Sequence, residues 1–99
     1  MYRIVLLPLA GKDIRMAMKW YEDKSYELGQ KFREEVFLQI DKLKNDFIER
    51  SSVFEGLSRV FLKRFPYVIY YQKNPVSGVI TVFAILNQKQ DRNILRTRV

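Results

Sequence analysis

Two stretches of the chain place apolar residues at helical spacing. In the first, over residues 14–21, they recur at steps of three and four, which predicts the buried face of an amphipathic helix. Asp13 stands near the expected start of this helix, where a carboxylate interacts favourably with free N–H groups and the helix dipole. The second stretch, residues 32–47, keeps one apolar face over about four turns. The apolar positions are Ile14, Ala17, Met18 and Tyr21, then Phe32, Val36, Ile40, Leu43 and Phe47.

The connection between these stretches is short, with a break expected over residues 25–29. Two helices joined in this way should form an antiparallel hairpin. The second helix carries opposite charges four residues apart, Lys31 with Glu35 and Lys42 with Asp46. Because such pairs stabilise exposed helix surfaces, we expect a solvated face here, without a catalytic role.

The remaining apolar segments have the pattern of strands. Residues 2–7 are rich in β-formers and apolar on both faces, which is typical of a central strand. Residues 67–72 are aromatic and β-branched, and 79–86 is almost wholly apolar. Over residues 59–65 the period changes to two, with Arg59, Phe61, Lys63 and Phe65 alternating with Val60, Leu62 and Arg64. A turn is expected over 74–78, where Asn, Pro, Ser and Gly gather.

The order of these elements is strand, helix, helix, strand, strand, strand, followed by a polar and basic tail over 87–99. No repeat or linker divides the chain, so we expect one α+β domain over residues 1–99. Its N-terminal strand and helical hairpin would precede a three-stranded meander, and together the strands would form a mostly antiparallel sheet.

The apolar start of the chain also has some features of a secretory signal. The run over residues 4–10 is interrupted by Pro8, however, and leads directly into Lys12 and Asp13, so a strand explains it better. No segment approaches the roughly 20 apolar residues of a membrane span. We therefore expect a cytoplasmic protein that does not interact with membranes.

The composition excludes several kinds of active site. The 99 residues contain no His and no Cys, which removes thiolate nucleophiles, disulfides, thiolate zinc sites and the usual general base. Any catalysis would rest on Asp, Glu, Lys, Arg, Tyr or the groups of a partner. The sequence contains no Gly-rich phosphate loop and no plausible metal cluster, so we expect no metal and no cofactor.

The net charge of +7 lies entirely in the second half of the chain. Residues 1–56 hold equal numbers of basic and acidic residues, whereas residues 57–99 hold eight basic residues against Asp91 alone. This asymmetry favours one basic face that binds phosphate or an acidic protein segment. Alternatively, the basic residues simply solubilise the strands and protect a sheet edge.

Several segments in a characteristic order carry a family resemblance. The most specific is the R-F-P-Y run with the strand after it, residues 64–71, preceded by Arg59. Residues 2–5, 20–22 and 82–86 match as well. Together they resemble the toxins of RelE/ParE-type toxin–antitoxin modules, also called plasmid-stabilisation proteins, over nearly the full length. Further matching positions are Ala10, Asp13, Ile14, Gly29, Phe32 and Val36.

This resemblance implies a helical hairpin packed on a mostly antiparallel sheet. It also implies an antitoxin from the same operon, whose extended acidic and apolar segment wraps the toxin, in a homo-oligomer or a hetero-oligomer. RelE-like members cleave mRNA in the ribosome, whereas ParE-like members poison DNA gyrase. The long second helix and the R-F-P-Y run favour the ParE-like branch, which has no chemistry of its own. The alternative is a ribosome-dependent endoribonuclease of the RelE type.

The segment after the last strand departs from the family pattern. Many members have H-x-x-R-D there, whereas this chain has Asn87 in place of His and Gln90 in place of Arg, and keeps only Asp91. These departures suggest a third hypothesis, a degenerate member that binds its antitoxin without being toxic.

A nuclease would need a base near the 2′-hydroxyl, positive charge on the phosphorane and an acid for the leaving oxygen. The candidates are Arg59, Lys63, Arg64, Tyr70 and Tyr71. The tyrosines equally suit half-buried packing positions. Arg59 equally suits a structural role, either holding a carboxylate in the core or pairing with the loop around Glu55. Trp20 and the helical phenylalanines are expected in the core rather than as a stacking platform. The expected partner- or target-binding residues are Arg59, Lys63, Arg64, Asn87, Asp91, Arg92, Arg96 and Arg98.

Overall fold

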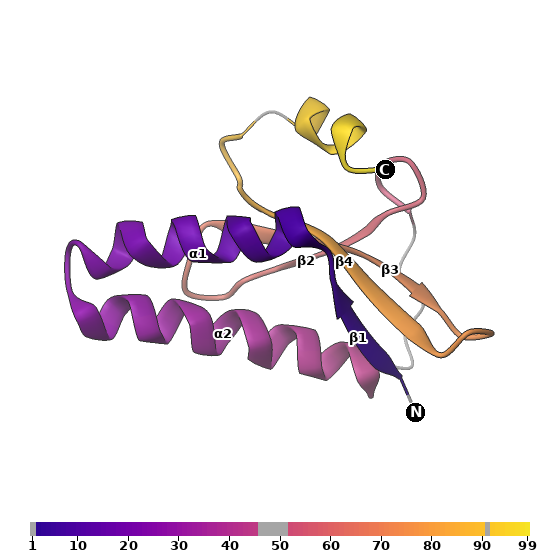
Figure 1. Ribbon diagram of the computed structural model, residues 1–99, viewed down its shortest axis with the longest axis horizontal. Helices are drawn as coiled ribbons and strands as arrows, with labels where there is room; N and C mark the ends of the chain where they lie inside the picture. Colours follow the sequence, from indigo (N-terminus) through magenta and orange to yellow (C-terminus); the bar gives the residue numbers. More distant parts are fainter. Residues whose placement is uncertain (1, 46–51, 91) are drawn as a thin grey trace.

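A four-stranded sheet with the strand order β1–β4–β3–β2 forms the frame of the molecule (Figure 1). The computed structural model describes residues 2–45, 52–90 and 92–99. β1 and β4 are parallel and the other pairs antiparallel, so the predicted element order and the α+β class are confirmed. The elements are β1 (Arg3–Leu6), α1 (Pro8–Glu22), α2 (Tyr26–Lys44), β2 (Ser58–Phe61), β3 (Tyr67–Asn74), β4 (Val79–Asn87) and the 3-10 helix η1 (Arg92–Thr97).

The first strand lies at an edge of the sheet, and its prediction as a central strand is wrong. Among the described strands, β1 pairs only with β4. Its apolar character has another cause, because Ile4 and Leu6 are half-buried against the core under the helices. The apolar side chains of β1 therefore reflect packing against the helices, and not a position between two other strands.

The helical hairpin begins earlier and turns earlier than predicted. Pro8 occupies the first turn of α1, where its missing N–H costs no hydrogen bond, so Asp13 lies in the middle of the helix and not at its start. The connection covers only residues 23–25. Gly29 lies inside α2, and a Cβ there would stand 2.2 Å from Cγ of Glu22 and 3.0 Å from the carbonyl oxygen of Met18. Gly29 therefore lets the two helices approach closely. None of the described helices is long and apolar enough to span a bilayer.

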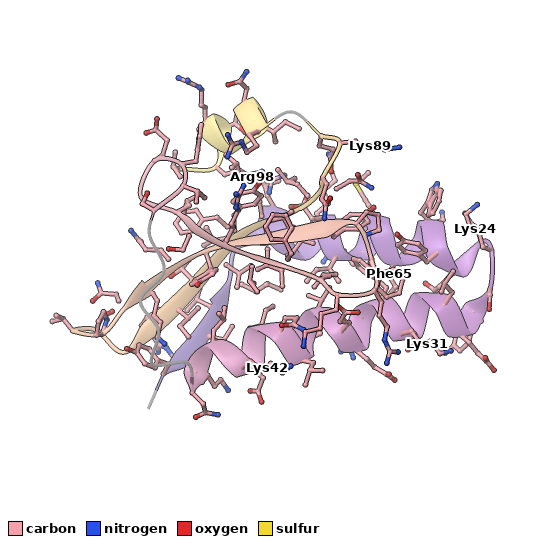
Figure 2. The ribbon with its side chains drawn as sticks, turned by 180° about the vertical axis from the view of Figure 1, so that it is seen from behind. Lys24, Lys31, Lys42, Phe65, Lys89 and Arg98 are labelled. Carbon is pink, nitrogen blue, oxygen red and sulfur yellow. The ribbon has the colours of Figure 1, made fainter. Side chains whose placement is uncertain are left out.

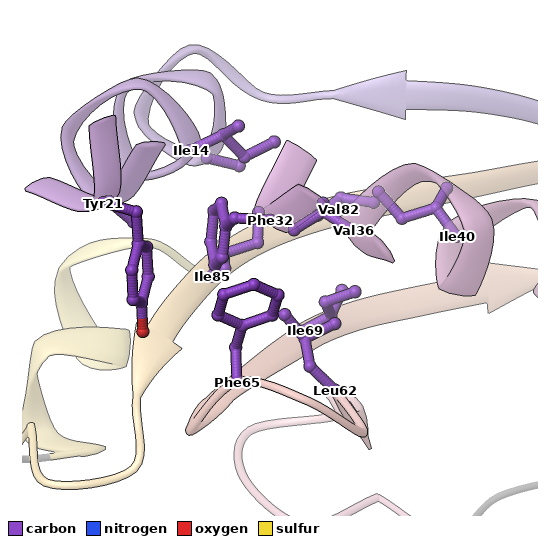
Figure 3. Close-up of a cluster of buried hydrophobic side chains, with 12 residues drawn as sticks. Ile14, Tyr21, Phe32, Val36, Ile40, Leu62, Phe65, Ile69, Val82 and Ile85 are labelled. Atoms are coloured by element: carbon purple, nitrogen blue, oxygen red, sulfur yellow. The ribbon is translucent and has the colours of Figure 1, made fainter. Parts of the chain in front are cut away.

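The main core lies between the two helices and the sheet (Figure 3). Its centre is aromatic. The ring centroids of Tyr21 and Phe65 are 4.9 Å apart, and those of Phe32 and Phe65 are 5.2 Å apart, both edge-to-face. The predicted apolar stripes are confirmed in the described residues, with Met18 half-buried and the others buried. Phe47, from the end of the second stripe, lies outside the described residues.

The opposite face of the sheet is covered by η1. Leu95 is fully buried there against Val68, Tyr70 and Leu86. A bulge lets β4 contribute Ala84 and Leu86 to this second core: Tyr70 pairs with Ala84 and Tyr71 with Val82, which leaves Phe83 as an extra residue. The bulge reverses which residues of β4 face the helices, and so explains why residues 79–86 are apolar almost without interruption.

Strand β2 ends sooner than the alternation predicts. After Phe61 the chain bends, because the carboxylate of Glu35 accepts hydrogen bonds from the backbone N–H groups of Lys63 and Arg64, the latter at 3.1 Å to Oε1. Glu35 is only 8% exposed, so the prediction that it belongs to a solvated, ion-paired face is wrong. Asp46, from the second predicted ion pair, lies outside the described residues.

Candidate functional site

A groove of about 630 Å³ runs between the outer flank of α1 and the adjacent ends of β3 and β4. We call it the α1 groove. Tyr21 forms part of its lining, and burial, with a smaller contribution from the phenol of Tyr67, raises the pKa of Tyr21 above its ordinary value of 10.0. The side chains that line the groove also include Met16, Trp20, Pro66, Tyr67, Asn87 and Lys89.

The α1 groove has an exposed apolar wall. Trp20 is 56% exposed and Met16 is 63% exposed. The prediction that Trp20 belongs to the core is therefore wrong, and its position could have been found from the sequence. Trp20 precedes the buried Tyr21 by one residue, which turns it about 100° around the helix from the buried stripe. The Lys24 Nζ lies 4.3 Å from the centroid of the Trp20 ring, so a positive charge borders the indole.

An internal ion pair fixes one side of this groove. Nη1 and Nη2 of Arg98 donate to Oδ2 and Oδ1 of Asp13, at 2.8 Å and 3.0 Å. Asp13 Oδ2 also accepts from the N–H of Ile85 at 3.0 Å, and Arg98 Nη1 donates to the carbonyl of Phe83 at 3.1 Å. Because β1 ends opposite Val82, the ion pair satisfies the backbone of β4 beyond the end of β1. It also ties the C-terminal segment to α1.

The segment at the end of β4, where Asn87 and Gln90 stand in the positions of His and Arg in the H-x-x-R-D pattern, forms a tight turn. Oδ1 of Asn87 accepts from the N–H of Lys89 at 2.9 Å, and Oε1 of Gln90 accepts from the N–H of Asn87 at 2.7 Å. The two replacement residues therefore close the turn that carries Lys89 on the rim of the α1 groove. Asp91, the residue that keeps the family pattern, lies outside the described residues.

A second, smaller groove of about 310 Å³ lies along the outer flank of α2. We call it the α2 groove. The loop over residues 62–66 separates the two grooves: Lys63 and Arg64 line the α2 groove, whereas Pro66 lines the α1 groove. Phe65, between them, is buried in the core. The α2 groove is formed by Lys31, Glu34, Glu35, Leu38, Gln39, Lys42, Lys63 and Arg64.

The structure does not bring all five candidate nuclease residues to one place; of them, Arg59 and Tyr70 are cross-strand partners. Tyr70 and Tyr71 are each 3% exposed and belong to different apolar clusters, on opposite faces of the sheet. Arg59 lies beside Tyr70 in the register, with its guanidinium 5.0 Å from the ring of Phe61. Lys63 and Arg64 instead face α2.

The basic residues of the second half also lie at separate places, and not on the single face expected from the charge asymmetry. Lys73 Nζ donates to the carbonyl of Leu43 at 2.7 Å, at the end of α2. Arg96 lies over the ring of Phe54, 5.7 Å from its centroid, and Arg98 is paired with Asp13. Arg92 is exposed at the start of η1. Over the residues that the structure describes, no cluster of three or more acidic side chains could hold a metal ion.

No protein-family model matches the chain, and no curated protein matches its sequence. Among solved structures, the chain is similar to a chain of a chromosomal ParDE TA system from P. aeruginosa, with a TM-score of 0.73. The match covers 88% of this chain and 96% of that chain, at 19% sequence identity. Together with the order of strands and helices, this likeness shows that the chain has the ParE-like fold and confirms the resemblance at the level of the fold.

Proposed function

We propose that this chain is the toxin component of a type II toxin–antitoxin module, that it binds a cognate acidic antitoxin and that its target is DNA gyrase. The ParE-like fold carries this proposal, since the similar solved chain comes from a ParDE TA system. The charge and the exposed apolar surface of the molecule add support.

The antitoxin is proposed to occupy the α1 groove. Met16 and Trp20 offer apolar contact area, and large aromatic side chains of this kind dominate the binding energy of many protein interfaces. Lys24 and Lys89 border the same surface. A segment that alternates apolar side chains with carboxylates would bury its apolar side chains against Trp20 and place its charges beside these lysines.

The choice of gyrase over mRNA rests on the placement of the candidate catalytic groups. RNA cleavage needs a base, an acid and positive charge around one phosphate. Tyr70 and Tyr71 are buried on opposite faces, and Asn87 is engaged in a turn. This arrangement supports a toxin that acts by binding and not by its own chemistry.

Expression of the chain in a bacterium, with and without the product of the adjacent open reading frame, tests the proposal. The chain alone should stop growth and induce DNA damage while mRNA stays intact, and the neighbouring acidic protein should restore growth. Codon-phased mRNA cleavage would instead identify the ribosome as the target. Harmless accumulation at high level would contradict the toxic activity and favour a member that only binds antitoxin.

A further inference from the structure

We infer that the α2 groove binds the phosphodiester backbone of nucleic acid. This inference goes beyond the proposed toxin function and does not depend on it. It rests on the side chains that the loop over residues 62–66 and α2 bring together, and on the contrast between this groove and the α1 groove.

Four cationic side chains from two elements line the α2 groove. Lys31 and Lys42 lie on the same flank of α2 (Figure 2), eleven positions apart, which is about 16 Å along a helix. Lys63 and Arg64 line the same groove from the loop. Among the described residues, no ion pair or hydrogen bond engages the terminal nitrogens of these four side chains.

The loop side of the groove is held by a buried carboxylate. Glu35 accepts the backbone N–H groups of both Lys63 and Arg64, which fixes the main chain at the two cationic residues. The Glu35 carboxylate thus already accepts hydrogen bonds from two backbone N–H groups. With Glu34 as the other acidic residue, the groove has four cations against two carboxylates, and keeps a positive net charge.

Phosphates suit this groove better than an acidic protein segment does. A protein segment needs apolar anchors at the centre of its interface, and among the residues that line the α2 groove only Leu38 is apolar. Phosphate contacts need cations and no apolar surface. Over about 16 Å, duplex DNA presents roughly nine charges, which is ample for four cations spread along the groove.

The test is the salt dependence of binding, measured by fluorescence anisotropy on the purified full chain without antitoxin or gyrase. The probes are a short labelled duplex DNA and a labelled single-stranded RNA of equal length. If all four cations contact phosphates, the logarithm of the association constant should fall with that of salt with a slope of about −3.6 on duplex DNA, so that binding weakens about 150-fold when salt rises about fourfold.

Two double variants remove the groove cations in pairs: Lys31→Ala with Lys42→Ala, and Lys63→Ala with Arg64→Ala. Each should make the slope on duplex DNA shallower by about two. The matched control, Lys12→Ala with Lys19→Ala, removes the same charge from exposed positions of α1 that line neither groove. Its slope should equal that of the wild-type chain. Thermal melting checks that every variant is folded.

The two probes separate the possible sources of the phosphodiester, since the tighter-bound probe identifies DNA or RNA. Equal slopes for the wild-type chain and both groove variants on both probes would overturn the inference. So would variants that lose binding to a polyglutamate peptide while their slopes on nucleic acid stay unchanged, because the groove would then be a site for acidic protein.

Discussion

The two helices of the hairpin lie side by side, yet their outer flanks form surfaces of different chemistry. The flank of α1 exposes Trp20 and Met16 beside a groove of about 630 Å³. The flank of α2 presents Lys31 and Lys42 beside a groove of about 310 Å³. The buried stripes of both helices are similarly apolar, so the difference lies only in the residues that the core does not use.

The two grooves are separated by the R-F-P-Y run, residues 64–67. Arg64 lines one groove, Phe65 is buried in the core, and Pro66 and Tyr67 line the other. One short loop thus positions both surfaces at once. Because this loop lies between the two grooves, we expect each groove to respond to mutation without the other.

The largest effect is expected at the ion pair that borders the α1 groove. Asp13→Ala would leave the guanidinium of Arg98 and the N–H of Ile85 without their carboxylate in a site where both charged side chains are nearly buried. Loss of one partner of such a pair costs about 3 kcal/mol of unfolding free energy. Urea denaturation measures this loss.

The double variant Asp13→Ala with Arg98→Ala is the control for that prediction. It removes both charges, so it should be more stable than Asp13→Ala alone. If the loss of stability in the double variant equals the sum of the losses in Asp13→Ala and Arg98→Ala, the two residues are not energetically coupled. The slope of nucleic-acid binding against salt should not change in any of them, because neither residue lines the α2 groove.

The next effect is expected at Trp20 and concerns affinity instead of stability. Trp20→Ala removes the largest exposed apolar side chain of the α1 groove and should weaken antitoxin binding by at least about 2 kcal/mol, roughly 30-fold. Titration calorimetry with the neighbouring acidic protein measures it. Tyr26→Ala is the matched control, since Tyr26 is an exposed aromatic residue that lines neither groove. Equal losses in both variants would rule out the α1 groove as the binding site.

A smaller effect is expected at Glu35, which supports the α2 groove. Glu35→Ala leaves two backbone N–H groups without their acceptor and should cost about 1–3 kcal/mol of unfolding free energy. It should also weaken nucleic-acid binding at low salt, since the loop that carries Lys63 is no longer fixed, even though a negative charge is removed. Glu34→Ala, at the exposed neighbouring position, should change stability by less than about 0.5 kcal/mol. Tighter nucleic-acid binding by Glu35→Ala would show that Glu35 does not position the loop.

Much of the fold could be predicted because it depends on local periodicity. Steps of three and four residues located both helices, and the change to a period of two located the later strands. The bulge at Phe83 could not be predicted, because alternation within residues 79–86 is hidden by a core on each face of the sheet. The wrong prediction of β1 as a central strand has a similar origin. An apolar strand sequence indicates that the side chains are buried, but not how many neighbouring strands pair with the strand.

The site was less predictable because its key contacts join distant parts of the chain. Arg98 and Asp13 are 85 residues apart, and by charge alone Arg98 belongs with the other basic residues of the tail. Glu35 had a plausible partner four residues away in Lys31, and nothing local indicated that its carboxylate would instead bond the backbone of Lys63. The exposure of Trp20, in contrast, could have been predicted from the helical periodicity of α1.

The smallest predicted effect tests the floor of the α1 groove by titration. Burial raises the pKa of Tyr21 above 10.0 in the folded chain. As the pH rises above this ordinary value, the unfolded chain loses its phenolic proton while the folded chain keeps it, so the unfolded state binds fewer protons and the free energy of unfolding falls. The stabilisation is therefore complete below about pH 10 and is lost as the pH rises through the raised pKa.

Tyr21→Phe should flatten this part of the stability profile in urea denaturation from neutral to alkaline pH. An unchanged profile in Tyr21→Phe would show that the burial of Tyr21 is not the cause of this pH dependence.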